Sequence, residues 1–192
     1  MTKLVGIGGL FSSGKDTVAD YLVEKHGWVK MGMSEPLNDA LLTLNPWIPV
    51  RSDVYGEIIS ARRYQTLVDE IGYTEAKTNA EVRRLLQVLG TEVGRDMISE
   101  NVWVDTAERR IEAARAEGKS VILTGVRFMN ELMMVWHNTG ELWWVERPDL
   151  NNTAPTSGHA SENSVTSENF DTIIKNDGTL EDLYEKVERL LV

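Results

Sequence analysis

The sequence contains no cysteine, and this absence excludes several classes of protein. Disulfide frameworks, thiol nucleophiles, zinc–thiolate clusters and iron–sulfur centres all need cysteine, so the composition favours a cytosolic protein without them. Positive charge is scarce as well: 20 Lys and Arg face 30 Asp and Glu, a formal net charge of −10. This balance argues against non-specific binding of nucleic acid or of anionic membranes, because both need clustered positive charge.

Long hydrophobic runs are also missing near the start of the chain. The apolar run Leu4–Ile7 soon gives way to glycines, and it is too short for a secretory signal or a membrane-spanning helix. We therefore expect a protein that is neither exported nor membrane-spanning. With 192 residues, 42% of them apolar and only 5 prolines, the chain is typical of one globular domain, or of one domain with an inserted lobe.

Short apolar strands alternate with amphipathic helices along the chain. Residues 121–126 are almost continuously apolar, which is typical of a central strand covered on both faces. Further strands are predicted at 4–7, 28–31, 142–145 and 172–174, and later helices at 79–97, 102–118, 131–138 and 180–191. Residues 43–78 have no clean period and predict an irregular or mixed inserted lobe. The alternation predicts a three-layer, doubly wound α/β fold with a parallel sheet.

The most specific motif, Gly9–Thr17, lies between the first predicted strand and the first predicted helix. It matches the phosphate-loop pattern G-x-x-x-x-G-K-[ST] up to Lys15, which in such loops bridges the β- and γ-phosphates. Asp16 stands where Ser or Thr ordinarily ligates magnesium. Either Thr17 supplies the hydroxyl, or Asp16 holds the ion directly or through water. The alternative, a glycine turn beside a surface lysine, is disfavoured by the flanking strand and helix.

Polar residues recur at every fourth position along the helix predicted at 79–97. They are Arg83, Gln87, Thr91 and Arg95. Two guanidinium groups with an amide and a hydroxyl between them can clamp an anion, because the guanidinium fork matches phosphate oxygens. Gly90 and Gly94 adjoin this row and would let a ligand come close. The alternative is an ordinary solvated helix face.

Two further arginines follow predicted strands at the edge where ligands of open α/β sheets gather. Arg127 comes directly after the central strand, and we expect it to meet a phosphate. An ion pair with Glu131 is the alternative, and the two roles can coexist. Arg147 follows the strand at 142–145 and is expected to swing with a mobile loop onto the transferring phosphate, the alternative being a solvated loop arginine.

Three other residues are candidates for contacts with a nucleotide. Trp103 can stack on a base, although aromatic side chains at such positions are usually core packing. Asn176 and Gly178 belong to an Asn-Asp-Gly turn after the last strand, and the turn can also contact the edge of an adenine.

Four segments, in this order, resemble the deoxynucleoside monophosphate kinases of tailed bacteriophages. They are Ser13–Thr17, Leu86–Arg95, Gly125–Glu131 and Asn176–Leu180. The resemblance spans nearly the whole chain, and the form S-G-K-D-T of the loop is fairly specific to that family and to a few small-molecule kinases. Relatives tend to carry lysine where this chain has Asn38.

The resemblance implies an adenylate-kinase-like phosphate-loop fold with three parts. The expected parts are a core (1–33, 79–147 and 170–192), a monophosphate-binding lobe (34–78) and a lid (148–169). It implies that ATP and Mg²⁺ bind the loop, through Ser12, Ser13, Gly14, Lys15, Asp16 and Thr17, with Asn176 and Gly178 nearby. It places the acceptor nucleotide between the segment at Ser34 and the face formed by Gln87, Thr91 and Arg95. The residue patterns add Arg83 and Trp103 to the acceptor site, and they give Asp16 or Thr17 as the metal ligand.

The hypothesis is transfer of the γ-phosphoryl group of ATP to a deoxynucleoside 5′-monophosphate, in supply of nucleotides for DNA synthesis. The acceptor is already an anion, so no general base is needed, and catalysis reduces to alignment and neutralisation of charge by Lys15, Mg²⁺ and arginines. Arg127 and Arg147 are the expected catalytic arginines, with Arg95 as a further candidate.

Two rival hypotheses stay open at this point. A kinase of a hydroxyl acceptor, similar to dephospho-coenzyme A kinase, would need a carboxylate base such as Asp39 or Asp53. A regulatory switch would bind ATP without transferring phosphate. We expect the protein in the cytoplasm, that of the host if it is phage-encoded, without nucleic-acid or membrane partners. A homodimer stays open, because some relatives form dimers.

Overall fold

The computed structural model describes residues 2–10, 12–51, 58–148 and 165–191. Its helices and strands are, in chain order, β1 (Leu4–Gly9), α1 (Lys15–His26), β2 (Val29–Gly32), α2 (Glu35–Leu44), β3 (Trp47–Arg51), β4 (Ile58–Arg63), α3 (Tyr64–Ala76), α4 (Ala80–Val88), the π-helix η1 (Leu89–Ile98), α5 (Val102–Ala116), β5 (Val121–Thr124), α6 (Met129–His137), β6 (Glu141–Glu146), the 3₁₀ turn η3 (Ser167–Asn169), β7 (Thr172–Lys175) and α7 (Leu180–Leu191).

The chain forms two compact units. Unit 1 comprises Met1–Met33 and Thr106–Val192, and unit 2 comprises Ser34–Asp105. Unit 2 is larger than the lobe expected at 34–78, because it also contains residues 79–105, which the sequence analysis assigned to the core. Most of the lid expected at 148–169 lies outside the described residues.

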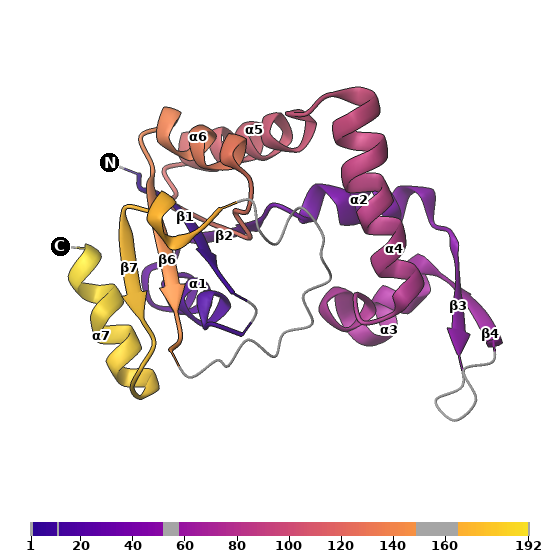
Figure 1. Cartoon of the computed structure of the whole chain (residues 1–192), viewed down its shortest axis with the longest axis horizontal. Helices are drawn as coiled ribbons and strands as arrows, with labels where there is room; N and C mark the ends of the chain where they lie inside the picture. The colour runs from indigo at the N-terminus through magenta and orange to yellow at the C-terminus, as the bar shows by residue number, and fades with distance from the viewer. Residues whose placement is uncertain (1, 11, 52–57, 149–164, 192) are drawn as a thin grey trace. The chain divides into compact units, whose positions relative to one another are not determined.

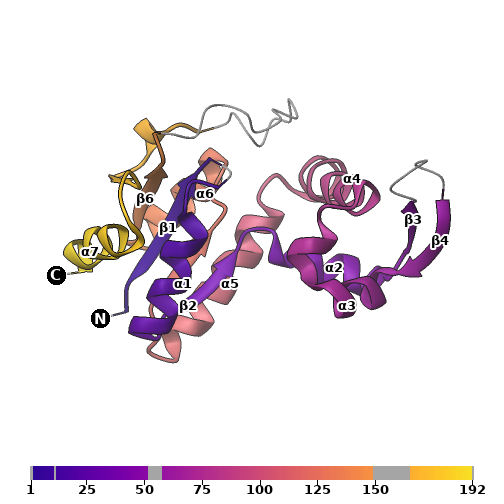
Figure 2. The ribbon, with the colours of Figure 1, turned by 90° about the horizontal axis from the view of Figure 1, so that it is seen from below.

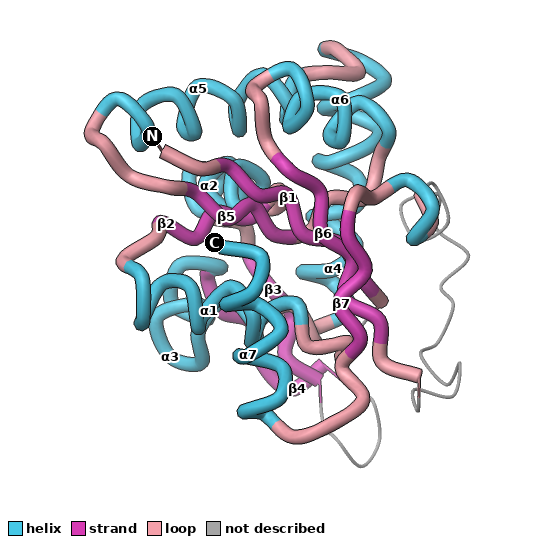
Figure 3. The backbone as a smooth tube through the Cα atoms, turned by 90° about the vertical axis from the view of Figure 1, so that its left-hand side faces the viewer, coloured by secondary structure: helices cyan, strands magenta, loops and turns pink. Residues whose placement is uncertain are grey.

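A five-stranded parallel sheet forms the centre of unit 1, with strand order β2-β5-β1-β6-β7. Helices α1 and α7 cover one face of this sheet, and α5 and α6 cover the other (Figures 1 and 3). The doubly wound α/β fold with three layers is thereby confirmed. Strand β5 pairs with β2 on one side and β1 on the other, as its continuous apolar sequence predicted.

Strand β1 is fixed by packing on both faces. Val5 and Ile7 belong to the buried cluster beneath α1 and α7, which also includes Leu22 of α1. Gly6 faces the opposite layer, where an added Cβ would lie 2.9 Å from Val135 of α6. Full burial of each Val or Ile contributes about 1.5–3 kcal/mol. The end of β1, where the glycine loop begins, is therefore held by a well-packed strand.

Helix α7 begins at a reciprocal cap formed by Thr179 and Asp182. The Thr179 hydroxyl accepts a hydrogen bond from the Asp182 amide at 3.2 Å, and the Asp182 carboxylate accepts one from the Thr179 amide at 2.8 Å. Such boxes satisfy amide groups that have no partner within the helix. Leu183 and Val187 then face the core of unit 1.

Unit 2 has a small core of its own. The buried members are Leu41, Ile48, Tyr64, Leu67, Ala76 and Val82. Strands β3 and β4 pair antiparallel (Figure 2), and the Arg63 guanidinium lies 4.5 Å from the centre of the Trp47 ring. The segment 43–78 is therefore mixed in its described part: a strand pair precedes helix α3.

The helix predicted at 79–97 is only partly α-helical. Helix α4 ends at Val88, and the π-helix η1 continues to Ile98, with bonds such as Ser99 N to Gly94 O at 2.9 Å. Each glycine lowers α-helix stability by up to ~1 kcal/mol, and Gly90 and Gly94 both lie in η1. A period of about four residues does not distinguish the two helix types, so the pattern predicted the helix and missed its wider turns.

No helix in the described part of the chain combines the length and the apolar character needed to span a membrane.

Candidate functional site

The loop between β1 and α1 has a backbone that only glycine adopts readily at two positions. Gly9 has φ +144° and Gly14 has φ +104°. An added Cβ at Gly9 would lie 2.6 Å from the carbonyl oxygen of Val145, and one at Gly14 would lie 2.6 Å from Nδ2 of Asn176. Both glycines are therefore required by the local geometry.

This loop has the features of a phosphate cradle. It leads into α1, whose first N–H groups have no partner within the helix and carry partial positive charge. Ser13 is buried, and within the described part of the chain its hydroxyl has no hydrogen-bond partner. A buried polar atom without a partner is costly. The loop therefore fits a ligand that is rich in acceptor oxygens.

Lys15 is the first residue of α1, and its side chain folds back over the loop. Its Nζ lies 3.4 Å from the carbonyl oxygen of Leu10 and 3.9 Å from the Asp16 carboxylate. Burial lowers the pKa of Lys15; Asp16 opposes this shift, whereas the positive charges of Arg127 and Lys30 add to it. A partly desolvated ammonium near other cations interacts strongly with an anion such as a phosphate.

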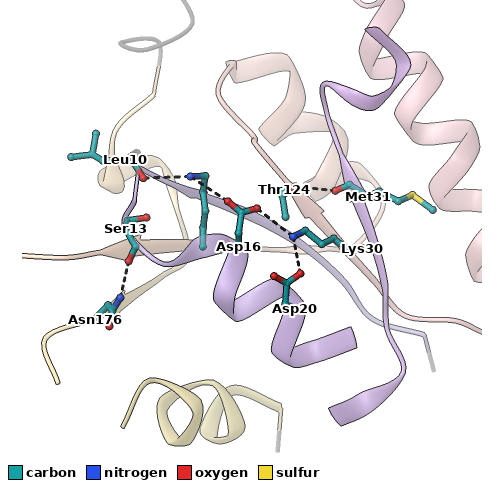
Figure 4. Close-up of polar contacts among 9 residues, drawn as sticks. Leu10, Ser13, Asp16, Asp20, Lys30, Met31, Thr124 and Asn176 are labelled. Atoms are coloured by element: carbon teal, nitrogen blue, oxygen red, sulfur yellow. Dashed lines mark hydrogen bonds and ion pairs between the residues drawn. The ribbon is translucent and has the colours of Figure 1, made fainter. Parts of the chain in front are cut away.

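Lys30 belongs to this group of charges, although the sequence analysis did not select it. It lies on β2, and its ammonium is 2.8 Å from Oδ1 of Asp20 and 3.4 Å from Oδ1 of Asp16. Figure 4 shows Lys30 directed toward both carboxylates. No sequence motif marked this lysine, because the contact depends on the packing of β2 against α1.

Asp16 and Thr17 have the donor atoms that Mg²⁺ prefers. The Asp16 side chain is 62% exposed, and it carries carboxylate oxygens at the first turn of α1; Thr17 adds a hydroxyl one position later. Among the described residues there is no group of three or more His, Asp or Glu side chains that would enclose a metal. Magnesium usually binds one or two carboxylates and completes its shell with phosphate oxygens and water, so these residues fit the ion.

Arg127 follows β5 and is exposed, with its charge close enough to Lys15 to lower the pKa of that ammonium. Glu131, the partner in the alternative ion pair, is buried, and its carboxylate accepts hydrogen bonds from the amides of Arg127 at 2.7 Å and Phe128 at 3.2 Å. Glu131 thus fixes the backbone that carries Arg127. Arg147 is exposed and follows β6.

Asn176 and Gly178 follow β7, at the same edge of the sheet as the loop. The Asn176 side-chain amide donates a hydrogen bond to the carbonyl of Ser13 at 2.9 Å, as Figure 4 shows. Gly178 is exposed, and an added Cβ would lie 2.5 Å from the Asp182 carboxylate. Asn176 therefore supports the loop backbone, and Gly178 leaves room for the cap of α7.

The predicted polar row lies in unit 2. Arg83 and Gln87 are on α4, and Thr91 and Arg95 are on η1. One guanidinium nitrogen of Arg95 donates to the carbonyl of Glu100 at 3.2 Å. Ser34 precedes α2, and its carbonyl accepts a hydrogen bond from the Tyr73 hydroxyl at 3.3 Å. We call Arg83, Gln87, Thr91 and Arg95 the acceptor face.

Trp103 packs directly on η1. Its indole N–H donates to the carbonyl of Gly90 at 2.8 Å, and an added Cβ at Gly94 would lie 2.4 Å from the same nitrogen. At Gly90, an added Cβ would contact Leu37 at 3.3 Å. The two glycines make room for protein side chains, whereas the sequence analysis assigned that room to a ligand.

A buried tyrosine beside α2 had no signal in the sequence. Tyr64 is fully buried and its hydroxyl donates to Oδ1 of Asn38 at 2.8 Å. Burial, together with the neighbouring Tyr73, raises the pKa of Tyr64 to about 12. Asn38, which stands at the position noted for lysine in relatives, is therefore held by unit 2 itself.

A glycine loop with a following lysine, at the carboxyl edge of a doubly wound parallel sheet, defines unit 1 as a phosphate-loop fold of the kinase type. A dephospho-CoA kinase from Campylobacter jejuni has the same fold, with a TM-score of 0.51 at 13% identity over 99% of this chain and 96% of that one.

A family model described as deoxynucleotide monophosphate kinase matches residues 48–187. The chain belongs to this family of phosphotransferases, which confirms the resemblance and the prediction of a nucleotide kinase. The glycine loop lies before the matched residues, so it is an observation separate from the match. Membership of a kinase family implies ATP as the phosphoryl donor and a nucleotide as the substrate.

Viral relatives match almost the whole chain. A protein of Acanthamoeba polyphaga mimivirus, assigned as a deoxynucleotide monophosphate kinase, is 26% identical over 96% of this chain and 93% of its own length. The deoxynucleotide monophosphate kinase of Escherichia phage RB69 is 23% identical over 98% of this chain and 99% of its own length. Both alignments include the glycine loop region.

Proposed function

We propose that this protein transfers the γ-phosphoryl group of ATP to the phosphate of a deoxynucleoside 5′-monophosphate, giving ADP and the deoxynucleoside diphosphate. The observation that carries the proposal is the glycine loop. Its glycines at positive φ, its Ser13 hydroxyl without a hydrogen-bond partner among the described residues and its partly desolvated Lys15 suit a polyphosphate. Membership of the family supports the choice of acceptor.

In this proposal, unit 1 binds ATP. Lys15 contacts the β- and γ-phosphates, and the loop backbone from Ser12 to Thr17 surrounds them. Asn176 holds the loop through the Ser13 carbonyl, and Gly178 lies on the adjoining turn. Asp16 or Thr17 holds Mg²⁺. When bound, the ion neutralises charge on the phosphate oxygens.

The chemistry needs cationic groups and no general base. The acceptor phosphate is already a nucleophilic anion, so the protein has to align it and to offset the charge that develops in the transition state. Lys15, Arg127 and Arg147 supply this charge. The backbone of Arg127 is fixed by the buried carboxylate of Glu131. We therefore propose that Arg127 starts from a fixed position beside the glycine loop.

Unit 2 binds the deoxynucleoside monophosphate in this proposal. The proposed contacts are Ser34, Trp103 and the acceptor face. The two arginines of that face match the phosphate, and Trp103 shapes η1 through its bond to Gly90. In this proposal residues 34–78 belong to the acceptor lobe, and a lid at 148–169, most of which lies outside the described residues, would exclude water from the reacting phosphates.

The experiment is ADP release from Mg-ATP by the purified protein, one acceptor at a time. The acceptors are dAMP, dCMP, dGMP, dTMP, the four ribonucleotides and dephospho-coenzyme A. Turnover with one or more deoxynucleotides is expected. Turnover with dephospho-coenzyme A alone would contradict the proposal and identify a hydroxyl acceptor, and ATP binding without any turnover would identify a switch.

The proposed product supplies precursors for DNA synthesis, in the cytoplasm of the infected cell if the chain is viral like its relatives. A homodimer is the proposed alternative to a monomer, and light scattering of the purified protein distinguishes them.

A further inference from the structure

Lys30 is the one lysine of β2, and both of its acidic neighbours belong to α1. Its ammonium lies 2.8 Å from Asp20 and 3.4 Å from Asp16. These two carboxylates are four residues apart and so lie on the same side of the helix. The ammonium of Lys30 is therefore held by two carboxylates of one helix.

The strand that carries Lys30 is held in place on its inner side. Strand β2 pairs with β5 in register, with Lys30 opposite Ile122. The Thr124 hydroxyl of β5 donates to the carbonyl of Met31 at 3.3 Å (Figure 4). The Met33 amide donates to the carbonyl of Thr124 at 3.0 Å. The direction of Lys30 is thus set by the sheet.

The Asp16 carboxylate lies between two ammonium groups. Its Oδ1 is 3.4 Å from Lys30, and its Oδ2 is 3.9 Å from Lys15. Each carboxylate oxygen of Asp16 therefore has its own neighbouring cation: Lys30 at Oδ1, and Lys15 of the glycine loop at Oδ2.

An aspartate at this position creates an electrostatic problem. In the ordinary phosphate loop a neutral Ser or Thr stands here, whereas Asp16 adds a negative charge beside the place where a polyphosphate is proposed to bind. Like charges several ångströms apart repel each other appreciably at a protein surface. A cation next to Asp16 reduces this repulsion, and Lys30 supplies one at Oδ1, in addition to the Lys15 ammonium near Oδ2.

We propose that Lys30 is a positioning residue of the nucleotide site: it holds Asp16 through Oδ1 and offsets its charge, so that the loop binds nucleotide phosphates even without a metal ion. The inference rests on the proposed ATP site in unit 1. It assigns a role to Lys30 in addition to the proposed contacts of Lys15, Asp16 and Thr17, and this role operates through Asp16.

The test is a double-mutant cycle on ADP binding, measured by titration calorimetry with Mg²⁺ and with EDTA. The variants are Lys30→Met, Asp16→Ser and the double variant. In the wild-type background, loss of Lys30 is expected to weaken metal-free binding about three- to tenfold, and to weaken binding less when Mg²⁺ is present. In the Asp16→Ser background, loss of Lys30 is expected to have little effect, because the charge it offsets is gone.

Two conservative variants and one remote variant complete the cycle. Lys30→Arg keeps the charge and should restore metal-free binding, and Lys30→Gln replaces Lys30→Met if the latter does not fold. Lys119→Met removes a surface lysine that forms an ion pair with Glu117 at 3.2 Å. Lys119 precedes β5, so it lies at the edge of the sheet opposite the glycine loop. Lys119→Met is expected to leave ADP binding unchanged, which controls for net charge.

The outcomes separate the possible roles of Lys30. Equal loss of affinity in both backgrounds would show that Lys30 contacts the phosphates directly, and it would overturn the inference. A lower melting temperature with unchanged ADP affinity would leave only a structural tie between β2 and α1, which also overturns it. Failure of the wild-type protein to bind ADP under any condition would instead reject the proposed nucleotide site on which the inference rests.

Discussion

The nucleotide site proposed for unit 1 and the acceptor face of unit 2 are built from different parts of the chain. In unit 1, the site is a backbone loop in which Gly9 and Gly14 have positive φ and the Ser13 carbonyl is held by Asn176. In unit 2, the proposed contacts are side chains on α4 and η1, two of them arginines. One site depends on a main-chain shape, the other on separate side chains.

Because of this difference, we expect the two sites to respond differently to substitution. A backbone cradle depends on a conformation that its residues share, so one wrong residue distorts the whole loop. Side chains along a helix act more independently, so a substitution of one of them removes only the contact that this side chain makes. We therefore expect large losses in unit 1 and moderate, separable losses in unit 2.

The largest expected effect follows the change Lys15→Met. Removal of this ammonium takes away the main positive charge over the loop, and kcat/KM should fall about 100- to 1000-fold, as when a preorganised charge donor is deleted from an active site. Steady-state ADP release measures it, with Lys119→Met as the control of equal charge. Full activity in Lys15→Met with unchanged ATP affinity would place the nucleotide elsewhere.

Gly9→Ala should give the second largest effect. The new Cβ would meet the carbonyl of Val145, which is backbone and cannot move aside, at a positive φ. We expect a loss of about 2 kcal/mol of unfolding free energy together with loss of ADP binding, measured by urea unfolding and calorimetry.

Gly27→Ala is the matched control for this change. Gly27 also has a positive φ, of +67°, at the end of α1, but nothing lies within 4 Å of an added Cβ. It should cost about 1 kcal/mol of stability and leave ADP binding intact. Equal binding by the two alanine variants would show that the close packing at Gly9 is not what shapes the loop.

The glycine loop and its place between a strand and a helix could be predicted from the sequence, because the residues of the loop are contiguous. A glycine loop with Lys15 requires only the strand before it and the helix after it, and both were readable from apolar runs. Lys30 was not predictable, because its contact with Asp16 depends on how β2 lies in the sheet beside β5 and on the direction of α1. Contacts between segments that are far apart in the sequence cannot be predicted from a local sequence pattern.

Unit 2 was less predictable for two physical reasons. Strand β4 is exposed along its whole length, so it lacks the alternation that marks a half-buried strand. In η1, Trp103 packs against Gly90 and Gly94, and the sequence analysis interpreted these two glycines as space for a ligand. The apolar period over 79–97 still predicted a helix there.

At the acceptor face, we expect one substitution to have a moderate effect on KM that is selective for the deoxynucleoside monophosphate. Arg83→Ala should raise KM for the deoxynucleoside monophosphate about tenfold and leave ADP affinity unchanged, because a charge-assisted contact to phosphate is lost in unit 2 alone. Arg84→Ala is the matched control: Arg84 is the next residue along α4, and it forms two hydrogen bonds to Glu81 at 2.7 and 2.9 Å.

Arg84→Ala should change KM less than twofold, because surface ion pairs contribute little. Equal changes in KM for the two variants would mean that only the general positive charge of α4 matters. A change in ADP affinity with Arg83→Ala would break the comparison, since it would show that the acceptor face and the glycine loop do not act separately.

The smallest expected effect lies at the other end of α1, far along the helix from its first residue, Lys15. Glu188 accepts hydrogen bonds from the Tyr21 hydroxyl at 2.6 Å, and its carboxylate lies 2.7 Å from the His26 ring. These contacts lower the pKa of Glu188. A carboxylate with a lowered pKa stabilises the fold above its ordinary pKa, and that contribution is lost as pH falls through the lower, folded-state value.

Glu188→Gln should therefore lower the melting temperature slightly at neutral pH, and the difference from wild type should shrink as pH falls below about 4. Melting curves at a series of pH values measure it, and the difference between the two proteins cancels the titration of other carboxylates. ADP binding at neutral pH should not change, because the loop is held by Asn176 and by its own glycines. Weaker ADP binding in Glu188→Gln would mean that the packing of α1 on α7 helps to shape the loop, and that the nucleotide site is less local than its backbone geometry indicates.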